Sequence, residues 1–267
     1  IANYNTNGIW LQDGSSLVST GTPLNPNWLV RYQSVQEQPV LLGGSSPAAG
    51  VPVGAYHFNN SAPSAAFRFN KFTCPANGGC DVYHVAFPYN FTNLLVQDCE
   101  FWGGANYFGG GTNSVTRLKN NLFWRTPFIA TSTASNSLSL SNNLFALISS
   151  KIQITQPTGS VWNAFDNMFD TCWIDSAATC SNGYNAYFTS TNLITPVSAG
   201  NIVSSSAFSY SSGALGNYYQ LSTSLPVNRG STTADVAGLY HYTTQSTQKK
   251  ETNSVVHIGY HYVALDT

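Results

Sequence analysis

Residues that could carry acid–base chemistry are few in this chain, and only two small groups have a useful spacing. Asp166 and Asp170 are four residues apart, and two carboxylates within about 10 Å are the minimum for glycoside hydrolysis. Arg117 and Lys119 could supply the base of a polysaccharide lyase, which also needs acidic Ca²⁺ ligands. These four residues are the candidate catalytic set, either for a polysaccharide lyase or for a glycoside hydrolase.

The histidines form a second group near the end of the sequence. On one face of an extended strand, His257 and His261 would lie roughly 13 Å apart, too far to hold one metal ion. His241 and His261 each stand between two tyrosines, which favours packing against the core. Tyrosine rings also stack on sugars, so a glycan-binding surface is an alternative. We expect no metal ion and no cofactor.

The spacing of the five cysteines divides them into two close pairs and one single residue. Cys74 and Cys80 enclose one short loop, and Cys172 and Cys180 enclose another. A zinc site needs four ligands, which neither pair supplies, so a zinc site is not favoured and two local disulfides are predicted. Disulfides indicate an oxidising compartment. Cys99 is left over and is predicted to be a buried thiol.

The elements that must position these residues follow from a repeat. One short phrase occurs four times, as Leu94–Phe101, Thr116–Phe123, Leu138–Phe145 and Trp162–Phe169. The closing phenylalanines Phe101, Phe123, Phe145 and Phe169 are 22, 22 and 24 residues apart. A fixed period in this range is typical of a solenoid, in which each repeat is one coil.

Within each copy, apolar residues alternate before a polar pair, which is the period of a strand. At about 3.3 Å per residue, one repeat has room for three short parallel strands. Asparagine suits the sharp bend after the first strand, because it tolerates a left-handed backbone. Asn121, Asn143 and Asn167 should stack into a ladder of amides. Cys99 fills the same slot in the first copy and should interrupt that ladder.

These phrases resemble the repeat of right-handed parallel β-helix proteins. Asn7–Gly14, Gly238–Thr244 and Val256–Ala264 are similar to the ends of large, mostly uncharacterised secreted bacterial β-helix proteins. The resemblance implies an all-β chain forming a single right-handed parallel β-helix. It places first coils or a cap in residues 1–64, regular coils in 65–213 and a closing segment in 214–267.

The resemblance includes pectate lyases and polygalacturonases, but the patterns of these enzymes are mostly missing. Of the polygalacturonase phrases, Arg117-Leu-Lys119 alone echoes one. Asp98 and Asp166 are about three coils apart, ~14 Å, and cannot share an ion. Turn and surface roles are therefore favoured for the acids. In the closing segment, Asn228 and His257 replace two acids of the family pattern, so a ligand role tied to those acids is in doubt.

Composition narrows the function classes. Charged residues make up 8% of the 267 residues, and the formal net charge is −1, which argues against nucleic-acid binding. No apolar run approaches the ~20 residues of a membrane-spanning helix. Such a surface fits a secreted or cell-surface protein that meets extracellular glycans or copies of itself. We therefore predict a non-catalytic structural or adhesive module that forms homo-oligomers or fibres. The alternatives are the lyase or hydrolase above and a glycan-binding module without turnover.

Overall fold

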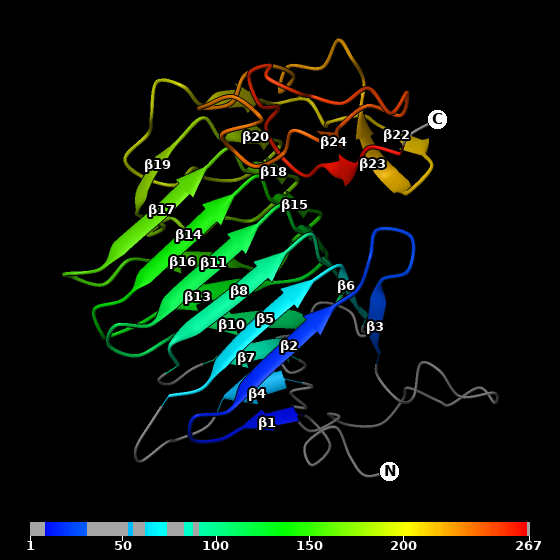
Figure 1. The fold of residues 1–267 in the computed structure, drawn as a ribbon. Helices are drawn as coiled ribbons and strands as arrows, with labels where there is room; N and C mark the ends of the chain where they lie inside the picture. Colours follow the sequence, from blue (N-terminus) through cyan, green and yellow to red (C-terminus); the bar gives the residue numbers. More distant parts are fainter. Residues whose placement is uncertain (1–8, 31–52, 56–61, 74–82, 88–90, 266–267) are drawn as a thin grey trace, which may run out of the picture.

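A computed structural model of the chain describes residues 9–30, 53–55, 62–73, 83–87 and 91–265 (Figure 1). All regular elements among these residues are β-strands, and none is a helix. Most of the strands belong to three parallel sheets. The described chain is therefore all-β, as the alternating pattern predicted. The predicted Cys74–Cys80 disulfide lies outside the described residues.

Three sheets hold the parallel strands. The first contains β1 (Ile9–Leu11), β4 (Val53–Ala55), β7 (Tyr83–Phe87), β10 (Ala105–Phe108), β13 (Phe128–Thr131) and β16 (Ile152–Thr155). The second contains β2 (Ser16–Thr20), β5 (Ser64–Arg68), β8 (Asn93–Gln97), β11 (Val115–Lys119), β14 (Ser137–Ser141), β17 (Val161–Phe165) and β19 (Ser181–Gly183). The third contains β3 (Asn27–Val30), β6 (Asn70–Thr73), β9 (Glu100–Trp102), β12 (Leu122–Trp124), β15 (Leu144–Ala146), β18 (Met168–Asp170), β20 (Ala186–Phe188) and β21 (Ile202–Ser204).

The chain visits the three sheets in a fixed order, and one passage through them is termed a coil here. Each strand inside a sheet pairs in parallel with the equivalent strand of the coil before it and of the coil after it. Val115 of β11, for example, pairs with Asn93 of β8 and with Ser137 of β14. Equivalent residues of successive coils therefore lie in columns. The pairing already includes Ser16–Thr20, within the residues expected to form first coils or a cap.

One column consists of aromatic rings. The ring centroids of Phe101, Phe123, Phe145 and Phe169 are 4.8, 4.8 and 5.0 Å apart, and neighbouring rings are within 6° of parallel. Tyr187 extends the stack at 5.0 Å. These spacings match the distance between neighbouring strands. The period of the phenylalanines is thus the period of the coils.

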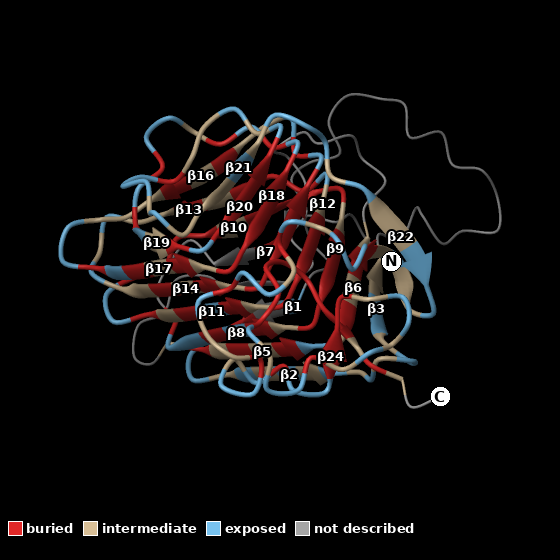
Figure 2. Ribbon diagram, turned by 90° about the horizontal axis from the view of Figure 1, so that it is seen from above, coloured by how far each residue is buried: buried red, intermediate tan, exposed pale blue. Residues whose placement is uncertain are grey.

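Alternation along the second sheet sets which side chains enter the core. On β8, Leu94 and Val96 are buried, whereas Leu95 between them is 37% exposed. The equivalent residues of the next three coils are also buried: Thr116, Leu118, Leu138, Leu140, Trp162 and Ala164. Figure 2 shows the buried positions concentrated in the strands and the exposed ones in the loops. Burial of this apolar face is the main favourable term for each coil.

The second residue of each polar pair forms an amide ladder inside the stack. The Nδ2 atom of Asn121 donates to Oδ1 of Asn143 (3.0 Å), and Nδ2 of Asn143 donates to Oδ1 of Asn167 (2.9 Å). The backbone N–H groups of Asn121 and Asn143 donate to the same acceptors. Asn185 and Asn201, which the repeat did not identify, continue the ladder. Every amide thus satisfies buried backbone as well as its neighbour.

Cys99 is a buried free thiol in the same column. Its backbone N–H donates to Oδ1 of Asn121 (3.0 Å), and its Sγ accepts from the N–H of Asn70 at 3.4 Å. Sulfur is a weak acceptor, so Cys99 weakens the ladder at this point but does not interrupt it as expected. Burial raises the pKa of this thiol.

The predicted disulfide between Cys172 and Cys180 is wrong, because both cysteines are free and buried. Cys172 lies at the corner after β18, and Cys180 directly precedes β19 in the second sheet. Between them the chain crosses the end of the first sheet, where Ile174 and Thr179 form parallel bridges to the previous coil. The two cysteines therefore occupy different corners of one coil, although only seven residues separate them.

A second corner column explains what Cys172 does instead. Thr126, Cys172 and Ser190 occupy equivalent corners, and the side chain of each contacts a carbonyl oxygen of its own coil and one of the preceding coil. The contacts of Cys172 Sγ are 3.2 and 3.4 Å long. In the coil between Thr126 and Cys172, the same position holds the buried Ile148, which follows Leu147 (φ 54°) as Cys172 follows Thr171 (φ 55°). The thiol thus takes the place of a hydroxyl at a position that also accepts an apolar side chain.

The closing segment leaves the parallel sheets and folds back over them. It contributes three short strands that form antiparallel pairs: β23 (Gly216–Gln220) with β22 (Tyr210–Gly213), and β24 (Tyr242–Thr243) with β25 (Tyr262–Val263). Tyr219, Ile258, Tyr260 and Tyr262 pack against outward-facing residues of the third sheet, among them Leu122, Leu144 and Met168. The segment (orange to red in Figure 1) therefore gives this sheet a second core on its outer face.

Removing one rung tests the amide ladder. We expect Asn143→Ala to lower the free energy of unfolding by roughly 2–4 kcal/mol, because several buried partners of this side chain lose their hydrogen bonds. Urea denaturation followed by circular dichroism measures the change. Ser139→Ala, on the outer face of the preceding strand β14, is the matched control and should shift stability by less than about 0.5 kcal/mol. Equal effects of the two substitutions would contradict the ladder.

Candidate functional site

The closing segment is attached to the coils along one corner, where the second sheet turns into the third. Four residues in successive coils occupy this corner with left-handed backbones: Asp98 (φ 56°), Asn120 (54°), Asn142 (54°) and Asp166 (60°). Each is the first residue of a polar pair, and each is a type that tolerates this conformation. The side chains of all four bond to the closing segment.

Asp98, in the earliest of these four coils, binds Tyr242 of the closing segment. Its Oδ2 accepts from the hydroxyl of Tyr242 (2.8 Å) and from Nε of Arg68 (3.0 Å), and its Oδ1 accepts from Nδ2 of Asn120 (2.8 Å). Burial raises the pKa of the Tyr242 hydroxyl, and the charge of Asp98 adds to this effect. The cluster joins residues 144 positions apart in the sequence.

The two middle asparagines bind the backbone of the histidines. Asn120 accepts from the N–H of His261 (2.7 Å) and donates to the carbonyl oxygen of the same residue (2.9 Å). Asn142 donates to the carbonyl oxygen of His257 (3.2 Å). Because an amide side chain both donates and accepts, these contacts hold the closing segment much as a neighbouring strand would.

The candidate catalytic acids are used in the same way. Both carboxylate oxygens of Asp166 accept from Ser231, one from its N–H (2.7 Å) and one from its hydroxyl (2.6 Å). Asp170 accepts from the hydroxyl of Tyr210 (3.0 Å). Burial raises the pKa of both acids, and these hydrogen bonds oppose the rise. Each acid is thus bonded to chain that follows the coils.

The candidate bases lie elsewhere. Arg117 and Lys119 both belong to β11, and Arg117 is exposed on the outer face of the second sheet. Burial lowers the pKa of Lys119, and the charge of Asp98 opposes that shift. The register places Lys119 beside Ser141, and Ser141 beside Phe165. Asp166 therefore lies about two coils from Lys119, roughly 10 Å along the stack, so the predicted set is not gathered around one point.

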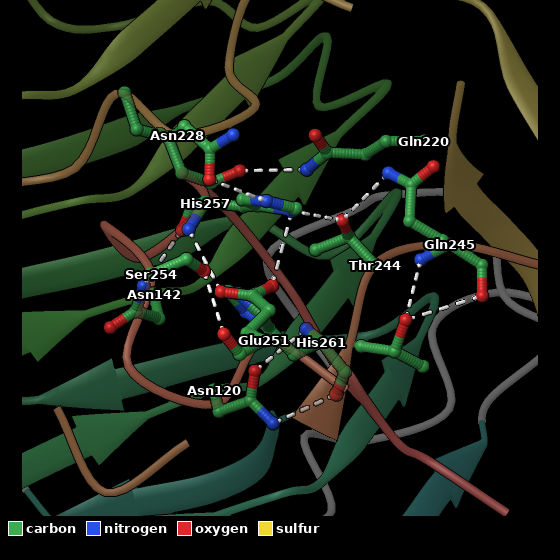
Figure 3. A network of polar contacts seen from close by, with 12 residues as sticks. Asn120, Asn142, Gln220, Asn228, Thr244, Gln245, Glu251, Ser254, His257 and His261 are labelled. Carbon is green, nitrogen blue, oxygen red and sulfur yellow. Dashed lines mark hydrogen bonds and ion pairs between the residues drawn. The ribbon is translucent and has the colours of Figure 1, made fainter. Parts of the chain in front are cut away.

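A different cluster lies inside the closing segment, where Glu251 stands between two histidines (Figure 3). Its Oε1 is 3.1 Å from Nδ1 of His257 and 2.9 Å from Nε2 of His261. The ring centroids of the two histidines are 6.3 Å apart. All three residues are buried, with exposures of 4%, 6% and 1% in the order Glu251, His257, His261. The expectation of two distant histidines on an extended strand is wrong.

Gly259 is the reason that the two histidines meet. Its φ of +102° turns the chain between them, a conformation that side chains with a Cβ rarely adopt. A Cβ at this position would also lie 3.1 Å from Cβ of Met168. The backbone N–H of His257 donates to Oε2 of Glu251 (3.0 Å), which completes the turn around the carboxylate.

The hydrogen-bond partners of His257 exclude a nucleophilic relay. Its Nδ1 contacts Oγ1 of Thr244 (2.5 Å) as well as Glu251, whereas its Nε2 faces Oδ1 of Asn228 (3.2 Å). A relay needs the nucleophile and the orienting acid on opposite ring nitrogens. Here the hydroxyl and the acid share one nitrogen, and Thr244 is fully buried.

Burial controls the charges of this cluster. It lowers the pKa of His257 to about 4, against the attraction of Glu251. Burial alone would raise the pKa of Glu251, but the two imidazoles and the N–H of His257 hold it below its ordinary value. Near neutral pH, Glu251 is therefore ionised and His257 is neutral. No three His, Cys, Asp or Glu side chains of the described ranges form a group that could hold a metal ion.

A cleft of about 530 Å³ opens above the cluster and is termed the polar cleft. Its wall includes Gln220, Asn228, Gln245, Lys249, Glu251 and His257. This volume falls within the usual range of small-molecule sites, about 300–1,000 Å³. Asn228 and His257, the two positions at which the sequence departs from the pattern it resembles, contact each other here. The departure was taken to put a ligand role in doubt, and no motif pointed to Glu251.

Comparisons with protein-family models, with curated proteins and with solved structures find no match for this chain. Among the residues that the structure describes, no helix is long and apolar enough to span a membrane.

The buried imidazole predicts a dependence of stability on pH. An unfolded His257 takes up a proton near its ordinary pKa of 6.5, and the folded one only near 4. The unfolded chain therefore binds more protons between these values, and stability falls as the pH falls from 6.5 towards 4. We expect His257→Gln to flatten this fall by up to about 3 kcal/mol. Urea denaturation at a series of pH values measures it.

His241→Gln is the control for that measurement, because His241 is exposed. His84, whose pKa burial also lowers to about 4, contributes equally in both variants. A pH dependence that is the same in His257→Gln and in His241→Gln would contradict the assignment.

Proposed function

We propose that the chain is a single right-handed parallel β-helix that serves as a non-catalytic, extracellular structural or adhesive module. The fixed order of the three sheets and the parallel pairing of successive coils support one continuous winding. Connections between parallel strands are right-handed in nearly all proteins, which supports the handedness.

The observation that supports a non-catalytic function is that the buried carboxylates are hydrogen-bonded within the fold. Asp98, Asp166 and Asp170 are buried and bonded to chain that packs against the coils. Glu100 is buried beside Nζ of Lys71 (3.1 Å) and the indole N–H of Trp102 (3.0 Å). A general acid or base must reach its substrate directly or through one water. Acids that hold the fold together are poor candidates for that task.

The surface of the coils supports an adhesive or self-associating role. On the outer face of the second sheet, one column consists of Ser16, Ser64, Asn93, Val115, Ser137 and Val161. At the end of the third sheet, β21 pairs with β20 on one side and has no described partner on the other. Val203 in this edge strand is 62% exposed. An open strand edge is a ready template for another chain.

The proposed extracellular location is supported by the amino-acid composition. With free thiols at Cys172 and Cys180, that pair gives no support for an oxidising compartment. The low charge and the abundance of polar uncharged residues still fit a protein that meets glycans or copies of itself.

Incubation with glycans tests the absence of catalysis. We expect a panel of acidic and neutral polysaccharides, with and without Ca²⁺, to yield no new unsaturated or reducing ends. Ultraviolet absorbance and a reducing-sugar assay detect the two products. Turnover by the purified protein that disappears in Lys119→Ala or Asp166→Asn would overturn the proposal in favour of a lyase or hydrolase.

Sedimentation velocity tests the proposed self-association. We expect larger species to form as the concentration rises, and Val203→Lys to shift the protein towards monomer, because a charge at the strand edge opposes edge-to-edge pairing. Val236→Lys is the control, since Val236 is 74% exposed in the closing segment, away from this edge. A wild-type protein that stays monomeric at the highest concentration would count against self-association.

A further inference from the structure

Two hollows lie beside the loop formed by residues 225–230 of the closing segment. One is the polar cleft, and the other, of about 310 Å³, is termed the tyrosine hollow. The tyrosine hollow is lined by Tyr184, Gly200, Asn201 and Arg229, among others, and Asn228 lines both hollows. A ligand longer than one ring could therefore contact both.

Tyr184 brings an aromatic ring to the second hollow. It follows β19 with a left-handed backbone (φ 54°) and occupies the corner position that Asp166 holds in the preceding coil. In contrast to Asp166, it is 41% exposed. Its ring packs against Gly200, where a Cβ would lie 3.0 Å from a ring carbon. A ring that is fixed and partly open to solvent is suited to stack on the apolar face of a sugar.

The charges around the two hollows favour an anion. Arg229, Lys249 and Lys250 line them, which is three of the ten cationic residues in a chain with few charges. Arg229 and Lys249 make no ion pair within the described part of the chain. Glu251 is the acid in the wall, and its side chain is only 2% exposed and lies between two imidazoles. The local potential is therefore positive.

The neutral groups of the walls are donors and acceptors. Asn228 is exposed and lines both hollows. Gln220 is 3% exposed in the wall of the polar cleft, and its Oε1 has no hydrogen-bond partner within the described chain. Amides and hydroxyls match the hydroxyl groups of sugars, which also donate and accept.

We propose that the two hollows form one binding site for an acidic oligosaccharide. Tyr184 stacks on one sugar ring, Asn228 bonds to hydroxyl groups near the junction, and Arg229 and Lys249 pair with carboxylate or sulfate groups. This inference adds a ligand to the proposed scaffold. It rests on the proposed function only in holding that the bound oligosaccharide is not cleaved.

Isothermal titration calorimetry with the full chain tests the site. The probes are oligogalacturonate, a heparin-derived oligosaccharide, a cello-oligosaccharide of equal length and inorganic sulfate. We expect an acidic oligosaccharide to bind and the neutral one and free sulfate to bind at least about tenfold more weakly. Binding should weaken as the salt concentration rises, because the paired charges are exposed.

Variants separate the site from the general charge of the protein. Tyr184→Ala should weaken binding about tenfold, and Tyr184→Phe should retain it, because the ring carries the contact. Tyr240→Ala is the matched control, with the same 41% exposure outside both hollows. Arg229→Gln and Lys249→Gln should each weaken binding about fivefold, whereas Lys151→Gln should not. Arg229→Gln changes an exposed residue, so it tests the site even if Tyr184→Ala folds poorly.

The outcomes distinguish this inference from the scaffold proposal. If none of the probes binds, or if all variants bind equally, the acidic-oligosaccharide site is wrong and the scaffold proposal is unaffected. Equal or tighter binding of anionic vesicles or of single-stranded DNA would overturn the assignment to glycans. Turnover of a bound oligosaccharide would keep the site and overturn the non-catalytic proposal.

Discussion

Registered stacking of equivalent residues is the constraint on which the rest of this structure depends. Once one coil lies on the next without a shift, each phenylalanine meets a phenylalanine and each ladder asparagine meets an asparagine. A slip by one residue would turn every inward side chain outwards. The ladder opposes such a slip most strongly, because each amide binds both its neighbour and buried backbone. Aromatic stacking alone tolerates more displacement.

Corner geometry then couples the coils to the closing segment. At each corner, the left-handed residue directs its own side chain towards the outside. The residue that follows it directs its side chain into the stack. The inward asparagines hold the coils to each other, and the outward residues hold the closing segment. The same short phrase therefore serves two separate interfaces. Acids that look catalytic in the sequence, Asp166 above all, are therefore hydrogen-bonded to the closing segment.

Local periodicity was sufficient to predict the parts of the fold that repeat. The spacing of Phe101, Phe123, Phe145 and Phe169 reports a packing column directly, since each coil presents the same residue at the same place. Cys172 and Cys180 were misjudged because separation along the chain does not measure distance when a coil turns a corner between two residues.

The candidate site was less accessible to sequence reasoning, because its parts do not repeat. His257 and His261 were placed apart on the assumption of an extended backbone, and the positive φ of Gly259 brings them together. Glu251 lies in no recognisable phrase, and its contacts with His257 and His261 are a property of the folded closing segment. Substitutions at Asn228 and His257 were visible in the sequence, but their contact is a property of the tertiary structure.

The distant attachment of the closing segment has a consequence for how this protein folds. Stacked repeats ordinarily unzip from their ends, because each one touches only its neighbours. Here Tyr242 and His261 reach back 144 and 141 residues to Asp98 and Asn120, so the closing segment bridges coils that are synthesised much earlier than itself. Fraying at the C-terminal end must first break these long-range contacts, which makes unfolding more cooperative. High contact order slows folding in return, and the nascent stack lacks these contacts until the closing segment has been synthesised.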